Sequence, residues 1–255
     1  MIGQKKLKSK IDSYTLSTFP HSILLIGPRG SEKNEVCEYI ATKFDFPIYD
    51  ITELISEEYI NDIYAMPDFG LYVIDGTKIT EREQNILLKF YEEPSPYMYV
   101  VIMCESKYNI LETIQTRSYE LQMDFYTREE LESLCKPGLE EKILKIADTP
   151  GTVEELNHVK LDELRLLCEN VVNKIGVASY QNTLTIANKL NFKDEYEKYP
   201  LWAFLRMLGV VMLERKSKLY FLVQKFMKEY EPLLDKKRYF EGLLTDMWLE
   251  ARDGH

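Results

Sequence analysis

The residues from Gly27 to Asn34 have the types and spacing of a phosphate-binding loop. Gly27 and Lys33 match the first glycine and the lysine of the pattern G-x-x-x-x-G-K-[ST], in which backbone amides and the lysine hold phosphate oxygens and the hydroxyl ligates Mg²⁺. The second glycine is replaced by Glu32 and the hydroxyl residue by Asn34. Because a carboxylate repels phosphate and an amide is a poor Mg²⁺ ligand, we expect a degenerate, inactive loop.

A carboxylate at the end of an apolar run is the second candidate. In an active ATPase such a strand ends in Asp-Glu, where the aspartate holds Mg²⁺ and the glutamate orients the attacking water. Here Gly76 follows Asp75, so position 76 offers no side chain to activate water. The candidate cofactor-binding residues are Gly27, Gly30, Lys33 and Asp75. The alternative is that these residues serve structure alone, as a turn, a solvated lysine and a strand end.

Strands and helices alternate through the first half of the chain and must position these residues. Short, continuous apolar runs predict buried strands, and apolar residues at helical spacing predict the helices between them. The expected strands are residues 22–27, 46–49 at a sheet edge, 71–75 and 97–104, and the expected helices are residues 33–43 and 81–92. This order predicts an α/β fold, a parallel sheet with helices on both faces.

From Thr127 onward the pattern is helical throughout. Thr127 and Glu130 have the spacing of a capping box, and the expected helices are residues 128–135, 139–147 and 151–157, with longer ones from about residue 161. Breaks are expected near Gly176, at Tyr199-Pro200 and at Glu231-Pro232. We place the domain boundaries near residues 125 and 160. The predicted parts are an α/β module over 1–125, a small helical part over 126–160 and an all-α part over 161–255.

Composition excludes several classes of protein. The 255 residues carry 32 Lys plus Arg against 42 Asp plus Glu, and the net charge of -10 disfavours an independent DNA-binding protein. The four cysteines are far apart and form no Cys-x-x-Cys pair, so no metal site and no disulfide framework are expected. No apolar run approaches the roughly 18 residues of a membrane span, and no signal peptide is recognised. We expect a soluble, cytoplasmic protein that does not contact membranes.

The ordered series of motifs resembles one family, the AAA+ subunits of the sliding-clamp loader, in particular the delta-prime and gamma/tau subunits of bacterial DNA polymerase III. The resemblance is strong over residues 1–155 and only architectural beyond. The matching segments are Ile2-Gly-Gln4 (V-G-Q in the family), His21–Gly30 (H-A-Y-L-F-x-G-P-R-G), Asn85–Pro94 (N-A-L-L-K-x-L-E-E-P), Ile114–Ser118 (I-x-S-R-C, the arginine-finger motif) and Pro150-Gly151 (the P-G of the lid).

The resemblance implies an AAA+ P-loop module over residues 1–125, an all-α lid over 126–160 and an all-α collar over 161–255 that joins subunits into a ring. It implies a non-hydrolysing stator in DNA replication, without ATPase activity of its own but part of a DNA polymerase III-like holoenzyme. Arg117 would act in trans as an arginine finger on ATP and Mg²⁺ at the interface with a neighbouring subunit. No nucleotide of its own is firmly expected.

The implied partners are other clamp-loader subunits, reached through the collar and the Arg117 face. The sliding clamp and primer–template DNA would be reached through the complex. Bacterial relatives commonly insert a four-cysteine zinc module after the P-loop helix, but residues 47–70 contain no cysteine, so no metal is expected. This short form resembles a compact phage or divergent bacterial version.

Further departures from the family pattern weaken nucleotide handling in this chain but leave Arg117 in place. Thr152 follows the Pro-Gly where active subunits tend to carry an arginine, and Glu105 stands near the polar sensor position. Two alternatives remain open. The chain is a divergent AAA+ ATPase whose Lys33 and Asp75 still bind and hydrolyse ATP, or Arg117 is a structural arginine paired with acids such as Glu129 or Glu130.

Overall fold

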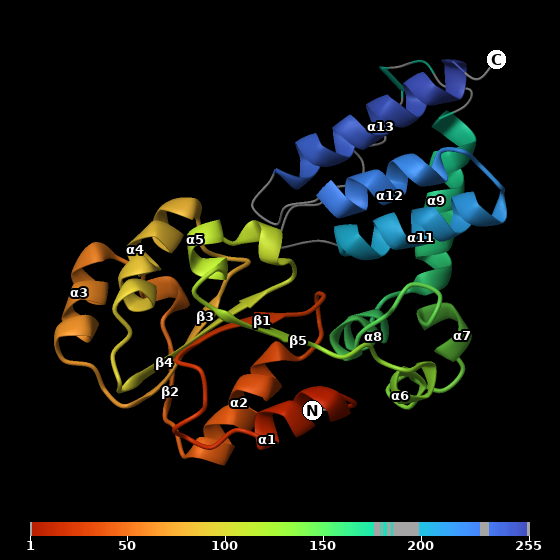
Figure 1. Ribbon diagram of the computed structural model, residues 1–255. Helices are drawn as coiled ribbons and strands as arrows, with labels where there is room; N and C mark the ends of the chain where they lie inside the picture. The colour runs from red at the N-terminus through yellow and green to blue at the C-terminus, as the bar shows by residue number, and fades with distance from the viewer. Residues whose placement is uncertain are drawn as a thin grey trace. The chain divides into compact units, whose positions relative to one another are not determined.

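The computed structural model describes residues 2–175, 179, 181–182, 185, 199–229 and 235–253. The chain divides into two compact units, which Figure 1 shows as ribbons. Unit 1 comprises Met1–Ser133 with Thr149–Thr152, and unit 2 comprises Leu134–Asp148 with Val153–His255. Each unit is described by itself.

A five-stranded parallel sheet forms the centre of unit 1. The strands are β1 (Ser22–Ile26), β2 (Ile48–Asp50), β3 (Gly70–Asp75), β4 (Met98–Cys104) and β5 (Tyr119–Gln122), in the order β2-β3-β4-β1-β5. This confirms the predicted α/β fold, including the edge position of the short strand near residue 48. Strand β5 was not expected, because only Leu121 of its four residues is buried and the segment has no apolar run.

Helices cover both faces of this sheet. Figure 1 shows α1 and α2 on one face and α3, α4 and α5 on the other. The helices of unit 1 are α1 (Lys5–Asp12), α2 (Lys33–Phe44), α3 (Glu57–Ala65), α4 (Glu81–Glu92), α5 (Glu112–Gln115) and α6 (Arg128–Glu132), with 3-10 turns at Thr52–Leu54 and Lys107–Asn109. The predicted stop of the helix ending at Glu92 is confirmed, since Pro94 follows two residues later.

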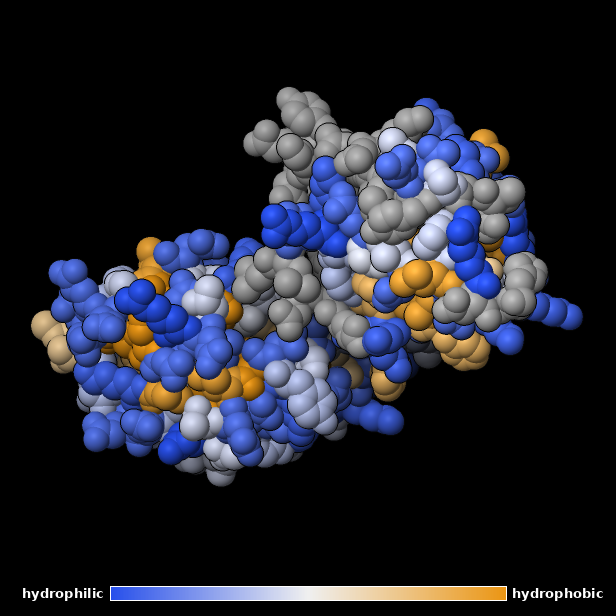
Figure 2. All heavy atoms as spheres, turned by 90° about the horizontal axis from the view of Figure 1, so that it is seen from above, coloured by the Kyte–Doolittle hydropathy of each residue, from blue (hydrophilic) through white to orange (hydrophobic). Residues whose placement is uncertain are grey.

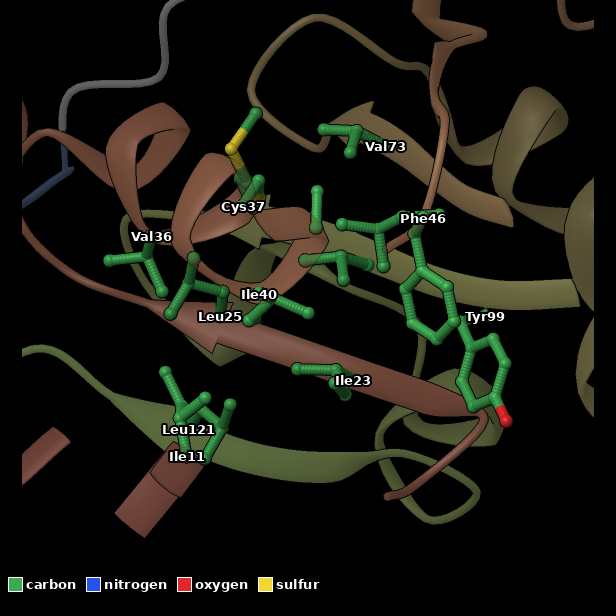
Figure 3. Close-up of a cluster of buried hydrophobic side chains, with 14 of the residues drawn as sticks. Ile11, Ile23, Leu25, Val36, Cys37, Ile40, Phe46, Val73, Tyr99 and Leu121 are labelled. Atoms are coloured by element: carbon green, nitrogen blue, oxygen red, sulfur yellow. The ribbon is translucent and has the colours of Figure 1, made fainter. Parts of the chain in front are cut away.

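Two separate cores explain why the strands read as continuous apolar runs. Successive side chains of a strand point to opposite faces, so a sheet covered on both sides needs apolar residues at every position. Ile23 and Leu25 of β1 pack with Val36 and Ile40 of α2, as Figure 3 shows. The intervening Leu24 belongs to the core on the opposite face, together with residues of α3, α4 and α5. Strand β1, which leads into the phosphate loop, is therefore held from both sides.

Unit 2 is helical, as predicted for the second half of the chain. Its helices include α7 (Glu140–Ile143), most of α8 (Pro150–Leu156), α9 (Leu161–Ile175), α11 (Leu201–Glu214), α12 (Tyr220–Glu229) and α13 (Lys236–Asp253). Phe204 of α11 and Phe240 of α13 are almost fully buried, with their rings edge to face at 5.3 Å. Pro200 precedes α11 as its N-cap residue, which confirms the break predicted there. The breaks predicted near Gly176 and at Glu231-Pro232 lie outside the described residues. Over the described residues, no helix is long and apolar enough to cross a membrane.

Candidate nucleotide site and arginine face

The two glycines of the phosphate loop are required by close packing. Gly27 continues strand β1, and its amide donates to the carbonyl of Cys104 at 3.0 Å. A Cβ on Gly27 would lie 2.3 Å from the Cγ of Met123. Gly30 has a φ of 70°, in the left-handed region that favours glycine. Both predicted glycine positions are therefore explained by the shape of the loop alone.

Lys33 turns back onto the loop that precedes it. Its ammonium donates to the carbonyl oxygens of Gly27 at 2.8 Å and Pro28 at 3.0 Å. Burial lowers the pKa of Lys33 below the usual lysine value, and the nearby charge of Glu105 opposes this shift, with a smaller contribution from Asp75. The lysine predicted to reach phosphate is thus engaged with the loop's own carbonyls.

Glu32 occupies the position of the second glycine and also keeps its backbone conformation. Its φ of 57° and ψ of 40° are left-handed, a conformation that costs a residue with a Cβ on the order of 1 kcal/mol. Asn34, which replaces the Mg²⁺-binding hydroxyl, is exposed in the first turn of α2. The loop therefore keeps a backbone shape suited to glycine while its side chains have changed.

The segment Thr149–Thr152 packs directly on this loop within unit 1. The Gly151 amide donates to the Gly30 carbonyl at 2.9 Å, and the Thr149 hydroxyl donates to the Arg29 carbonyl at 2.8 Å. A Cβ on Gly30 would lie 2.8 Å from the Thr149 hydroxyl oxygen and 2.9 Å from the amide nitrogen of Thr152. The two backbones therefore meet without room for another group between them.

The carboxylate at the end of β3 is held by its own turn. Asp75 accepts hydrogen bonds from the Thr77 amide at 3.0 Å and the Thr77 hydroxyl at 2.7 Å, and Lys78 lies 3.8 Å away. The next position has no space for a side chain, because a Cβ on Gly76 would lie 2.9 Å from both the Ile102 Cγ2 and the Met103 carbonyl oxygen. A water-activating glutamate therefore does not fit at position 76 in this fold.

Taken together, the residues present do not fit a Mg²⁺-bound nucleotide. The loop glycine is covered by Gly151, the lysine is bound to loop carbonyls, and position 76 is closed to a carboxylate side chain. No catalytic step is derived at this site. Within the described parts of the chain, no group of three or more His, Cys, Asp or Glu residues is placed to hold a metal ion.

Arg117 follows the short helix α5 and is 41% exposed in its side chain. Its Nη1 donates to the Thr113 carbonyl at 2.9 Å, and its Nη2 lies 4.0 Å from the Glu92 Oε1 at the end of α4. The predicted alternative partners, Glu129 and Glu130, are not those that the structure pairs with it. Glu130 instead accepts a hydrogen bond from the Thr127 amide and completes the capping box of α6. The guanidinium thus lies at the surface of unit 1, near Glu92.

Sequence reasoning missed the contacts that anchor the segment behind the loop. Gln4 is buried, and its side-chain amide bonds both backbone groups of Asp124, at 3.0 Å to the carbonyl and 2.7 Å from the amide. The Asp124 carboxylate accepts from the Lys6 and Leu7 amides and so holds the start of α1. The Tyr126 hydroxyl donates to the Ser31 carbonyl at 2.8 Å, and burial raises the pKa of Tyr126. The only sequence signal for these contacts was the Ile2-Gly-Gln4 segment.

Comparisons with known proteins agree with this architecture. Residues 50–126 match the family described as "DNA polymerase III, delta subunit". DNA polymerase III subunit gamma of Buchnera aphidicola subsp. Schizaphis graminum is 22% identical over 261 residues, covering 82% of this chain and 71% of the relative. The RuvB Holliday junction branch migration motor of Thermotoga maritima has a TM-score of 0.53 at 19% identity, covering 84% of this chain and 77% of RuvB. A variant of the same RuvB reaches 0.54 at 19% identity, with 98% and 88% covered.

Proposed function

We propose that this clamp-loader-like AAA+ protein is a non-hydrolysing stator subunit of a sliding-clamp loader in DNA replication, of the delta-prime kind. The observation that carries the proposal is the contact between Gly30 and Gly151, which covers the phosphate loop from within unit 1. A subunit that closes its own loop in this way does not need ATP to hold its shape. It can therefore serve as a fixed element against which ATP-driven neighbours move.

In the proposed role, Arg117 acts on the ATP of a neighbouring subunit. An arginine finger stabilises the charge that develops on the transferred phosphoryl group, generally worth about 10³–10⁵ in rate. Arg117 suits this role because its guanidinium is at the surface, held by the Thr113 carbonyl and only loosely by Glu92. Reaching a phosphate would require it to give up these two contacts.

The remaining parts of the proposal follow from the same family likeness. Residues 1–125 are proposed as the AAA+ module, 126–160 as the lid and 161–255 as the collar, in a cytoplasmic complex. Four large apolar side chains are exposed on the described helices of unit 2 and would suit a ring contact, namely Leu166, Leu213, Phe221 and Leu249. ATP and Mg²⁺ would lie at the interface with a neighbouring ATPase subunit. The sliding clamp and primer–template DNA would be met through the complex.

The experiment compares the isolated chain with a complex containing the cognate gamma-type ATPase subunit. The isolated chain should bind no ATP by calorimetry at micromolar concentration. In the complex, Arg117→Ala should lower the DNA- and clamp-stimulated ATPase rate while assembly remains intact. Arg117→Lys should rescue poorly, because an ammonium lacks the planar fork of a guanidinium. Arg128→Ala, another exposed arginine of unit 1, is the control and should leave the rate unchanged. Undiminished ATPase in an intact Arg117→Ala complex would remove the finger from the proposal.

A divergent ATPase is the second candidate, favoured by one observation. Lys33 and Asp75 remain near enough that the carboxylate raises the pKa of the lysine. Micromolar ATP affinity with Mg²⁺-dependent turnover by the isolated chain would support this candidate over the stator. Under the stator proposal, Lys33→Ala should change the ATPase rate of the complex by less than about twofold, because the lysine contacts loop carbonyls rather than phosphate.

A further inference from the structure

Helices α3 and α4 leave a groove between them on unit 1, with a cavity volume of about 370 Å³. One wall is a stripe of α4 at helical spacing, made of Arg82, Asn85, Ile86 and Lys89, and the other wall includes Glu57 and Asn61 of α3. Figure 2 views unit 1 from the side on which α4 and α5 lie, where apolar side chains appear among hydrophilic ones. This volume lies within the range of sites that accept small ligands or several side chains of a partner.

The two walls of the groove carry opposite charge. Arg82 is exposed and makes no ion pair with any described residue, and the Lys89 ammonium donates to the Asn61 side-chain oxygen at 2.7 Å rather than to a carboxylate. The α3 wall carries Glu57, and α3 contains two further acids and no basic residue. Ile60, which is 1% exposed, lies between the walls. The groove therefore offers cations on one side, an acid on the other and an apolar residue between them.

The groove is joined to the surface that carries Arg117. At one end, Lys89 lies over the Tyr64 ring at 4.4 Å, and the Tyr64 hydroxyl donates to the Glu93 carbonyl at 2.9 Å. Glu93 follows Glu92, whose carboxylate lies 4.0 Å from the Arg117 guanidinium. A protein that contacts Arg117 would therefore meet the groove as a continuation of the same surface.

We propose that the α3–α4 groove docks an amphipathic segment of the neighbouring ATPase subunit. In this docking an acidic residue of that segment pairs with Arg82, an apolar residue contacts Ile60 and Ile86, and a basic residue faces Glu57. The proposal rests on the function proposed above. A nucleic-acid strand is disfavoured as the occupant, because the α3 wall is acidic and the chain carries a net charge of -10.

The test measures the affinity of the full chain for the cognate gamma-type ATPase subunit by sedimentation. Arg82→Glu places an acid against the acid of the docked segment and should weaken binding about tenfold or more, with a smaller loss for Arg82→Ala. Folding should be kept, because Arg82 is exposed in the first turn of α4, where a glutamate is favoured by the helix dipole. The urea midpoint of each variant verifies this.

Arg128→Glu is the matched control for charge. Arg128 is also exposed in the first turn of a helix with a capping box, and it does not line the groove. Its substitution should change the affinity by less than about twofold. A photocrosslinker gives a second readout: Asn85→p-benzoylphenylalanine should form an adduct with the ATPase subunit, whereas the same substitution at Glu129 should not.

Several outcomes would overturn the docking proposal. These are equal effects of Arg82→Glu and Arg128→Glu, an adduct at position 85 with a second copy of this chain, or a loss of primer–template DNA affinity in Arg82→Glu without a loss of subunit affinity. The function proposed above fails differently, because then the wild-type chain would not associate with the ATPase subunit at all. That result would overturn both proposals, whereas normal association unaffected by Arg82→Glu would overturn the groove alone.

Discussion

The Gly151 amide donates to the Gly30 carbonyl at 2.9 Å, and neither glycine has room for a Cβ. On Gly151, a Cβ would lie 2.8 Å from the Cα of Gly30, which is backbone and cannot turn away as a side chain would. The phosphate loop and the first turn of α8 are thus joined by direct backbone packing over 120 residues of sequence.

This contact predicts that Gly151→Ala destabilises the protein. The added methyl group must push the two backbones apart, which should lower the free energy of unfolding by about 2 kcal/mol in urea titrations. Gly242→Ala in α13 is the control, because its Cβ would meet only the Phe226 ring at 3.7 Å. That change should be neutral or stabilising by up to about 1 kcal/mol, since alanine favours helix. Equal stability of Gly151→Ala and wild type would show that the contact is loose.

Restoring a glutamate after Asp75 should not restore ATP hydrolysis. Gly76→Glu should lower the free energy of unfolding by about 2 kcal/mol or more, because the side chain would meet Ile102 and the Met103 carbonyl. Gly76→Ala should already show most of this loss, since the clash begins at Cβ. The measurements are urea unfolding and steady-state phosphate release. A stable Gly76→Glu protein with Mg²⁺-dependent turnover would favour the divergent ATPase.

Tyr91→Phe should stabilise the protein. Tyr91 is buried in the core beside α4, and its hydroxyl makes no hydrogen bond among the described residues. Burial raises the pKa of Tyr91 well above its usual value, so the hydroxyl stays protonated and its removal deletes a buried polar group. We expect a gain of about 1 kcal/mol in thermal or urea unfolding.

The matched control is Tyr72→Phe in β3. The Tyr72 hydroxyl donates to the Asp68 carbonyl at 2.9 Å, so its removal should be neutral or cost about 1 kcal/mol. A gain in stability for Tyr72→Phe as large as that for Tyr91→Phe would refute the argument from the missing hydrogen bond.

Three of the four thiols should be inert in the native state. Cys37, Cys104 and Cys168 are buried, whereas Cys135 is partly exposed. At pH 8 an aromatic disulfide reagent should therefore modify one thiol per chain, and four after unfolding in guanidinium. Rapid modification of all four thiols without denaturant would contradict the burial.

The same thiols predict a loss of stability at alkaline pH. Burial raises the pKa of Cys37 and of Cys104 from 9.0 to about 12. The native state then holds the thiol protons more tightly than the unfolded state does, so their contribution is complete below pH 9 and is lost as the pH rises toward 12. Urea midpoints should be level from pH 7 to 8.5 and fall above about pH 9. Cys37→Ala should reduce that slope, whereas Cys135→Ala should not.

The sequence by itself determined the class of fold and the loss of catalytic groups. Runs such as Ser22–Ile26 are apolar at every position because both faces of the sheet are covered, and this demand is written locally in the chain. The replacements at Glu32, Asn34 and Gly76 are likewise visible without coordinates. Strand β5 escaped detection because an edge strand with one buried residue has no local signature.

Only the tertiary structure decided which residues meet. The partner of Arg117 is Glu92 rather than an acid after residue 127, and Gln4 binds the backbone of Asp124, 120 residues away. Such contacts depend on the path of the chain around the sheet, because parallel strands bring distant segments to the same edge. The phosphate loop illustrates the difference: its sequence shows changed side chains, whereas its closure by Gly151 follows from packing between segments that no local pattern connects.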